Sequence, residues 1–279
     1  MRMSRRGGRI TGIATGFALI ICVCDSPALA ACEFARQGEG RVGSVLDART
    51  FQLEDGREVR LAGIELAVDA AGPGRVILSS LIEGRDVTLH GFDDTPDRYG
   101  RQPAFVALID SAAPVQFEML TRGEALVSPT GSDPACFQAL LAREAAARAA
   151  RRGIWAGSAA LKNAKSTDDI LARLGQFTMV EGTVSSARLA GATFYVNFGR
   201  RWTRDFAVTI PRRMMPAVEA AGIDLKSLKD KKVRVRGWIE KRGGPRIEVT
   251  HVGQIEMIGA ARPIPKSDLA ATGPEDEGK

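Results

Sequence analysis

The chain has 279 residues, of which 44% are hydrophobic and 26% are charged. This length fits about two domains, and the hydrophobic fraction is sufficient for globular cores and excludes a membrane-embedded body. The formal net charge of +6 favours an anionic partner over a cationic one.

The first 31 residues have the pattern of an export signal. Arginines within residues 2–9 precede an apolar run over residues 10–23, and Ser26-Pro27 then breaks any helix. Small residues occupy the cleavage positions in Ala28-Leu29-Ala30. Because the apolar run is shorter than the ~20 residues that span a bilayer, we expect cleavage and a periplasmic or secreted protein. A retained membrane anchor is the alternative.

Cys32 and Cys136 are the cysteines that remain once residues 1–31 are removed. Two cysteines in an exported protein predict one disulfide. Another chemistry also fits, because Leu29-Ala30-Ala31-Cys32 resembles a bacterial lipoprotein box. In that case Cys32 would carry a lipid and Cys136 would stay unpaired. The polar stretch before the cleavage point favours ordinary cleavage, and with it the disulfide.

From residue 40 the sequence alternates short apolar strands with turn signals. Glu54-Asp55-Gly56-Arg57 is a hairpin turn, and Gly84 closes a helical stretch. The expected order is three strands, a helix and two strands, at residues 41–46, 50–53, 58–64, 76–84, 86–89 and 102–109. This is the order of an OB barrel, which closes its sheet and so removes exposed edges. Two helices are expected to follow, at 115–122 and 134–152.

The same order repeats in the second half of the chain. After a linker or strap over residues 156–175, strands are expected at 177–185, 192–198, 205–210, 232–239 and 246–258, with a helix that begins at Pro211. Residues 261–279, rich in Pro, Ala and Glu, predict a disordered tail. The predicted fold class is therefore mainly β with helices (α+β). It consists of two OB-like five-stranded barrels in tandem, at 32–155 and 176–260, the first with C-terminal helices.

The two halves differ in charge. Residues 32–160 contain 14 Lys and Arg against 18 Asp and Glu, whereas residues 161–263 contain 19 against 10. Such an asymmetry makes the second half the better candidate for an anionic partner. The alternative interpretation is that the basic residues serve solubility alone.

Four stretches of the first half, in their order and spacing, resemble the thermonuclease (staphylococcal-nuclease-like) family. They are Val45–Phe51, Glu58–Glu65, the turn Asp97-Arg98-Tyr99-Gly100-Arg101, and the ending Ala149-Ala150-Arg151-Arg152-Gly153-Ile154-Trp155. Each stretch alone is weak evidence, but their order and spacing over about 115 residues are specific. The resemblance implies an OB barrel and phosphodiester hydrolysis that depends on calcium.

The resemblance also shows what the site has lost. Arg49 stands where the family has an aspartate that binds calcium, and a guanidinium cannot replace a carboxylate ligand. Val68 stands where the family has the glutamate that activates the attacking water. Glu65 keeps a carboxylate at a further ligand position, where aspartate is usual. We therefore expect no cofactor, with calcium bound at Glu65 only if some activity remains.

Arg60 and Arg101 match the family's phosphate-clamping arginines, whose planar forks suit a developing phosphorane charge. The alternative is a structural role, with Arg60 paired to Glu65 and Arg101 bonded to turn carbonyls. General-base catalysis typically contributes about 10²–10⁴-fold and the metal several kcal/mol more. The loss of both the general base and the metal ligand predicts a pseudo-enzyme. Asp47 or Asp69 could still act as a substitute carboxylate, and the sequence leaves this alternative open.

The second half contains the stretches Val180–Gly182, Phe194–Gly199, Trp202, Arg204–Phe206, Val233–Trp238 and Ile247–His251. On these stretches it resembles OB modules attached to nuclease-like domains in bacterial envelope proteins, a less specific match than that of the first half. OB barrels bind single strands by stacking bases on aromatic side chains along a basic groove. The candidates for nucleic-acid binding are Tyr195, Trp202, Arg200, Arg201, Arg204, Arg234 and Arg236. The neighbouring Phe194, Phe198 and Phe206 are expected in the core, and Trp238 is expected to pack rather than stack.

Three functions remain in competition. The first is an exported protein that binds single-stranded nucleic acid or another polyanion and is inactive or weakly active as a nuclease. The second is a calcium-assisted endonuclease that uses Glu65 with a substitute carboxylate. The third is an envelope interaction module without a nucleic-acid role. Arg49 and Val68 favour the first.

Overall fold

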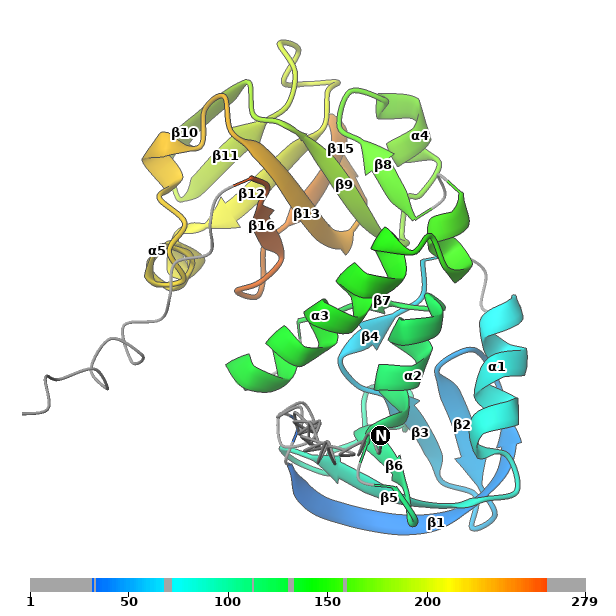
Figure 1. The fold of residues 1–279 in the computed structure, drawn as a ribbon. Coiled ribbons are helices and arrows are strands. Elements are labelled where there is room, and N and C mark those ends of the chain that lie inside the picture. Colours follow the sequence, from blue (N-terminus) through cyan, green and yellow to red (C-terminus); the bar gives the residue numbers. More distant parts are fainter. Residues whose placement is uncertain are drawn as a thin grey trace, which may run out of the picture.

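The computed structural model describes residues 32, 34–67, 72–111, 113–129, 133–157 and 160–259. The predicted export signal and C-terminal tail lie outside these residues, as do Val68 and Asp69. Within the described ranges, no helix is both long enough and apolar enough to cross a membrane. Figure 1 shows a first unit with a barrel and helices, a second unit made mostly of strands, and helix α3 (Pro134–Ala149) lying between them.

The first unit is built on a closed five-stranded barrel, as the sequence predicts. The strands follow the order β1-β2-β3-β6-β5, where β3 and β6 run parallel. Their bounds are β1 (Ala35–Val45), β2 (Thr50–Leu53), β3 (Glu58–Leu61), β5 (Asp86–Gly91) and β6 (Gln102–Leu108). Val59 and Leu61 alternate with more exposed residues along β3 and enter the core, which is the pattern of a strand with one buried face.

Three helices pack against the barrel and contribute to its core. Helix α1 (Pro73–Ile82) precedes β5, and α2 (Val115–Arg122) and α3 follow β6. A two-residue pairing joins β4 (Ile64–Glu65) to β7 (Leu126–Val127). The turn η2 (Gly153–Ala156) buries Trp155 and donates a backbone hydrogen bond from Ile154 to Gly123. The Arg-Arg-Gly-Ile-Trp ending is thereby fixed against the end of α2.

A disulfide joins Cys32, just before β1, to Cys136 in the first turn of α3. The two residues are 104 positions apart in sequence, with their Cα atoms 4.5 Å apart. Cys136 is buried in the core of the first unit. The bridge therefore ties the beginning of the barrel to the helix that contacts the second unit.

The strands of the second unit lie in two sheets, so a second closed barrel is not confirmed. One sheet has the order β10-β11-β12-β15-β14 and the other has the order β16-β13-β9-β8. The main strands are β9 (Phe177–Thr183), β10 (Ser186–Ala190), β11 (Thr193–Asn197), β12 (Ala207–Pro211), β13 (Lys232–Trp238), β14 (Glu240–Arg242), β15 (Gly244–Glu248) and β16 (Ile255–Met257). The parallel pair β12–β15 corresponds to β3–β6 of the first unit.

The strands of the second unit are interrupted, and for this reason their hydrogen-bonded ladders form two sheets. The predicted strand 177–185 corresponds to β9, and the unpredicted β10 follows it in the other sheet. In the same way the predicted strand 232–239 corresponds to β13, and the unpredicted β14 follows it in the other sheet. The predicted strand 246–258 divides into β15 and β16. The helix expected at Pro211 is also shifted: Pro211 ends β12, a short 3-10 turn η3 (Arg212–Met214) follows, and α5 spans Met215–Ala220.

The segment 156–175 is more than the linker that its composition suggests. It contains β8 (Leu161–Asn163), which pairs in parallel with β9, and helix α4 (Thr167–Leu171). Ala164 and Ile170 are buried in the core of the second unit. The composition of the segment did not predict β8 and α4, because only a few of its residues are apolar and face inward.

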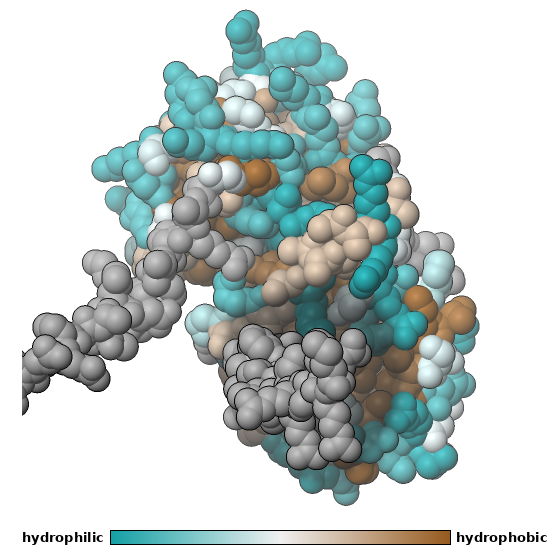
Figure 2. Space-filling view, in the orientation of Figure 1, coloured by the Kyte–Doolittle hydropathy of each residue, from teal (hydrophilic) through white to brown (hydrophobic). Residues whose placement is uncertain are grey.

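An apolar cluster joins the two units. Its buried residues come from both: Ala67, Leu126, Ala147 and Trp155 from the first unit, and Ala160, Phe177 and Met179 from the second. Gly253, in the loop before β16, also lies so close to Phe137 of α3 that a Cβ there would collide with the ring. On the face drawn in Figure 2, hydrophilic residues cover most of the second unit's outer end.

Candidate functional site

The barrel topology brings the predicted clamp residues together. Arg60 lies on β3, Arg101 lies immediately before β6, and these two strands are neighbours in the barrel. Arg49 lies in the turn before β2, and Glu65 lies on β4, which directly follows β3 in the chain. The side chains therefore meet at one end of the sheet although the sequence separates them.

Arg49 occupies the centre of this site. Its side chain is buried, and its Nη1 donates to the Ile64 carbonyl at 2.7 Å and lies 2.6 Å from Glu65 Oε1. The backbone N–H of Arg49 donates to Asp47 Oδ1 at 2.8 Å. A guanidinium thus bridges one carboxylate and one main-chain carbonyl, which are the kinds of oxygen that a hard cation needs.

The calcium ion that the thermonuclease resemblance implies does not fit these residues. Its oxygen donors, Glu65 Oε1 and the Ile64 carbonyl, already contact a permanent positive charge. A divalent ion placed beside them would be repelled by the Arg49 guanidinium at close range. No group of three or more His, Cys, Asp or Glu suited to a metal occurs among the described residues.

The two clamp arginines are held by carboxylates. Arg60 Nη2 lies 3.6 Å from Glu65 Oε1, and Arg60 Nη1 lies 3.9 Å from Asp97 Oδ2. Arg101 donates to Asp97 Oδ2 from Nε at 3.0 Å and from Nη2 at 2.7 Å. The structural interpretation expected the Arg60–Glu65 pair, but Arg101 binds a carboxylate rather than turn carbonyls. We call Arg49, Glu65, Arg60, Asp97 and Arg101 the arginine–carboxylate network.

The pKa values of the two carboxylates in this network shift in opposite directions. Burial raises the pKa of Glu65 above its usual value, against the opposing hydrogen bond and charge of Arg49. Burial also acts to raise the pKa of Asp97, but the hydrogen bonds from the Arg101 side chain and the Tyr99 and Arg101 backbone outweigh it and lower that pKa. Asp97 is therefore an anchor that stays ionised and orients Arg101.

Tyr99 is a residue that the sequence reasoning did not select. Its ring is 64% exposed and lies under two guanidinium groups, 4.8 Å from Arg98 and 4.9 Å from Arg101. Cations at this distance from an aromatic face attract it electrostatically. The sequence did contain a signal for Tyr99, because it is the aromatic residue of the Asp-Arg-Tyr-Gly-Arg turn that carries the resemblance to the thermonuclease family.

Replacing Arg49 by methionine is expected to lower the free energy of unfolding by about 2–3 kcal/mol, the cost of removing a hydrogen-bonded charge partner from a buried carboxylate. Arg60 remains near Glu65 and limits the loss. The Glu65→Gln change should cost less in the Arg49→Met background than in the wild type, and urea denaturation of the four proteins measures this coupling. Additive losses would show that the two side chains do not interact.

The second group of predicted residues lies mainly on one loop. Arg200, Arg201, Trp202 and Arg204 are exposed in the connection between β11 and β12, and Trp202 is 68% exposed. Tyr195 is half-buried on β11, on the opposite face from the core residues Phe194 and Val196. The exposed Arg188 of β10 is the cross-strand neighbour of Tyr195.

The hairpin of β14 and β15, which the sequence did not indicate, packs against this loop. A Cβ on Gly244, the first residue of β15, would lie 2.6 Å from the carbonyl oxygens of Arg204 and Asp205. This close backbone contact places the exposed Lys241 and Arg242 beside the arginine loop. We call the following exposed side chains of the loop and of β14 the basic tip: Arg200, Arg201, Trp202, Arg204, Lys241 and Arg242.

The predictions for Arg234 and Arg236 were wrong. Arg236 is 1% exposed and forms two charged hydrogen bonds with Glu144 of α3, at 2.8 and 3.0 Å. Arg234 is paired at 3.0 Å with both Glu181 and Glu256. Residues two apart on a strand share one face, and this face of β13 meets acidic side chains of α3, β9 and β16. Arg236 is buried, and both guanidinium groups are engaged by carboxylates.

Comparison with known proteins found a match within the first unit. A family model described as staphylococcal nuclease homologue matches residues 74–157. The matched range contains β5, β6, α2 and α3 with Asp97 and Arg101, and it begins after Arg49, Arg60 and Glu65. None of the curated proteins compared with the chain matches it. The match supports a thermonuclease-like domain here, and such a domain suggests nucleic-acid binding or nuclease function.

Proposed function

We propose that this chain, with its staphylococcal-nuclease-like domain, is an exported protein that binds the phosphodiester backbone of nucleic acid and is inactive or weakly active as a nuclease. The observation that carries the proposal is the Arg49 guanidinium, which contacts Glu65 Oε1 at 2.6 Å and the Ile64 carbonyl at 2.7 Å. The guanidinium takes up the oxygens that a metal ion would need, and it supplies no metal-bound water.

The consequences for hydrolysis follow from charge and basicity. A divalent metal lowers the pKa of a bound water and so generates the nucleophile, which a guanidinium cannot do because it has no open coordination position. Valine at position 68 cannot accept a proton from water. The arginine–carboxylate network retains Arg60 and Arg101, whose forks suit phosphate oxygens. We therefore propose binding without efficient turnover.

The basic tip supplies the second part of the proposal. Five of its six side chains are cationic and the sixth is an exposed indole, the combination that binds single-stranded nucleic acid through phosphate attraction and base stacking. The matching strand order and the parallel pair β12–β15 support the interpretation of the second unit as an OB-like barrel with interrupted ladders.

Export rests on the sequence pattern of residues 1–31 together with the cysteines. A disulfide between Cys32 and Cys136 persists in an oxidising compartment such as the periplasm or the extracellular space. A sulfur in this bridge cannot also carry a lipid, so the bridge favours ordinary signal cleavage over the lipoprotein alternative.

One experiment separates the three candidate functions. Purified protein is incubated with single-stranded DNA or RNA, in calcium or in chelator, and cleavage and binding are measured on the same samples. We expect binding in both conditions and little cleavage in either. Efficient cleavage that the chelator abolishes would establish the calcium-assisted endonuclease instead. Failure to bind at low salt would leave the envelope interaction module.

The Trp202→Ala variant is expected to bind single strands about 5- to 150-fold more weakly, since stacking contributes about 1–3 kcal/mol per base. Trp238→Ala is the matched control, because Trp238 is also about half exposed but packs edge-on against Phe177, 5.9 Å between ring centroids. Fluorescence anisotropy with a labelled oligonucleotide measures both. Equal losses in the two variants would remove the basic tip from the proposed binding surface.

A further inference from the structure

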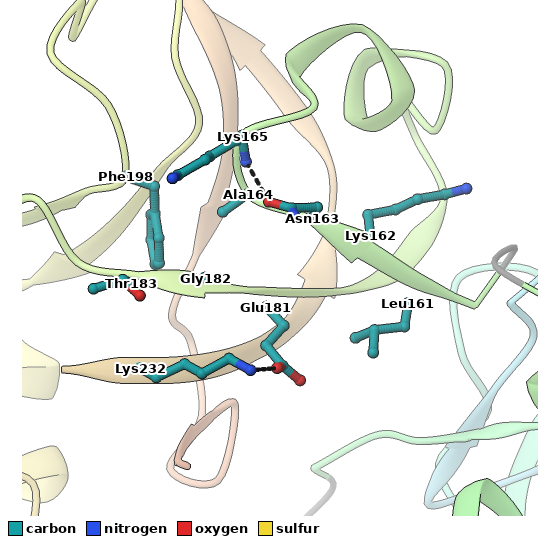
Figure 3. Close-up of a pocket in the computed structure, with 10 residues that line it drawn as sticks. All are labelled: Leu161, Lys162, Asn163, Ala164, Lys165, Glu181, Gly182, Thr183, Phe198 and Lys232. Atoms are coloured by element: carbon teal, nitrogen blue, oxygen red, sulfur yellow. Dashed lines mark hydrogen bonds and ion pairs between the residues drawn. The ribbon is translucent and has the colours of Figure 1, made fainter. Parts of the chain in front are cut away.

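A groove of about 350 Å³ lies between β8, the end of β9 and the end of β11 (Figure 3). Leu161, Ala164 and Phe198 provide its apolar side, and Lys165, Thr183 and Lys232 contribute polar groups. Gly182 shapes it, because a Cβ there would lie 2.5 Å from the Ala164 Cβ and 3.0 Å from the Phe198 ring. Only glycine allows β8, β9 and β11 to approach so closely at this point.

The groove carries positive charge. Its one lining carboxylate, Glu181, is already neutralised by Lys232 at 2.5 Å and by Arg234 at 3.0 Å. Burial acts to raise the pKa of Glu181, but the hydrogen bonds from Lys232 and Arg234 prevail and lower it. The amine of Lys165 points toward Phe198 in Figure 3 and forms no ion pair within the described part of the chain. An anion entering the groove therefore meets a cation that is not neutralised by a carboxylate.

The groove is continuous with the basic tip along the chain. Phe198 lines it, and the connection that carries Arg200, Arg201 and Trp202 begins at the next residue. The backbone of that connection is fixed at its start, where the Phe198 N–H donates to the Phe206 carbonyl and the Arg201 N–H donates to Asp205 Oδ2 at 2.8 Å. A short backbone segment held by these hydrogen bonds therefore joins the groove to the basic tip.

We propose that this groove binds a phosphate of the same single strand that the basic tip holds, with the Lys165 amine and the Thr183 hydroxyl facing the phosphate oxygens and the apolar side facing the sugar. The inference rests on the proposed function, and it extends the binding surface from the tip to β8. A lysine amine suits this task because it acts as a compact charge with three donors.

Two substitutions test the groove in the full-length protein. Lys165→Gln removes the charge. Asn163→Asp adds a negative charge while keeping the oxygen that accepts the Lys165 backbone N–H at 2.9 Å. The matched control is Lys226→Gln, which removes an exposed lysine of the same unit that does not line the groove. Thermal unfolding establishes that the variants fold as the wild type does.

The probes are oligothymidylates of about 4 and about 12 nucleotides, the range over which single OB folds bind. For the longer strand, each groove variant should bind several-fold more weakly, and Lys165→Gln should lower the slope of log affinity against log salt by about 0.7, one phosphate contact. The shorter strand, held by the tip alone, should bind all variants alike.

The outcomes separate this inference from the proposed function. If both strands bind the wild type but the groove variants match Lys226→Gln on the longer strand, the groove inference is overturned and the tip remains. If neither strand binds the wild type at low salt, both are overturned together. A loss on the longer strand alone supports both.

Discussion

Replacing Arg236 by methionine is expected to lower the free energy of unfolding by about 3–5 kcal/mol, because it leaves a buried carboxylate without its main charge partner. The Arg236 and Glu144 side chains are each 1% exposed, and two hydrogen bonds of 2.8 and 3.0 Å join them. Arg236 also donates to the Val127 carbonyl at 3.1 Å. A carboxylate buried at this depth cannot exchange the lost hydrogen bonds for bonds to bulk water.

The effect is expected to be large because this pair joins the two units. Arg236 belongs to β13 of the second unit, whereas Glu144 and Val127 belong to the first. Glu144 also accepts hydrogen bonds from the Val127 backbone at 2.7 Å and from Arg148 at 3.1 Å. Each carboxylate oxygen thus has two donors, and removing Arg236 removes one from each.

Urea denaturation of a small variant set measures this contribution. Arg236→Lys keeps the charge but loses the planar fork, and it should fall between the wild type and Arg236→Met. Adding Glu144→Gln to Arg236→Met should recover part of the stability, since an uncharged amide is less costly to bury. If Arg236→Met unfolds at the wild-type denaturant concentration, the pair makes no net contribution and the units are held by apolar contact alone.

Removing the Cys32–Cys136 disulfide is expected to cost about 4–5 kcal/mol by the loop-closure estimate, which depends on the length of the closed loop. The bridge spans a sequence separation of 104, which includes the entire barrel. Reduction lets the unfolded chain regain the freedom that the bridge removes. Cys136 is 2% exposed within the core, so the folded barrel should persist after reduction with lower stability.

The Cys32→Ala, Cys136→Ala double variant separates the crosslink from the packing of the sulfur atoms. Its denaturation midpoint should be low and indifferent to reductant, whereas the wild-type midpoint should fall to nearly the same value when reductant is added. The single Cys32→Ala variant controls for the buried cysteine, because it keeps the Cys136 side chain. A wild-type midpoint that does not respond to full reduction would contradict the estimate.

Local patterns in the sequence were sufficient to predict the fold of the first unit. Strands with alternating inward residues, the hairpin turn at Asp55-Gly56 and the glycine after α2 are decided within a few residues. The approach of Arg60 to Glu65 was also predictable, because the two residues flank a single turn between β3 and β4. Replacement of a carboxylate by Arg49 is visible in the sequence itself.

Local patterns could not predict contacts between segments that are distant in the sequence. Arg236 was assigned to ligand binding because it is a cation near aromatic residues, but its partner Glu144 lies 92 positions earlier in the chain. The role of β8 depends in the same way on pairing with β9. Neither partner is specified by any local periodicity.

The amino-acid sequence by itself determined the barrel of the first unit, the loss of an acidic metal ligand at position 49 and the excess of basic residues in the second half. Only the tertiary structure decided which of those basic residues face solvent. Arg200 and Arg204 remain exposed, while Arg234 and Arg236 are neutralised by carboxylates. The physical reason is that a charge can be buried only with a partner, and that partner comes from another part of the fold.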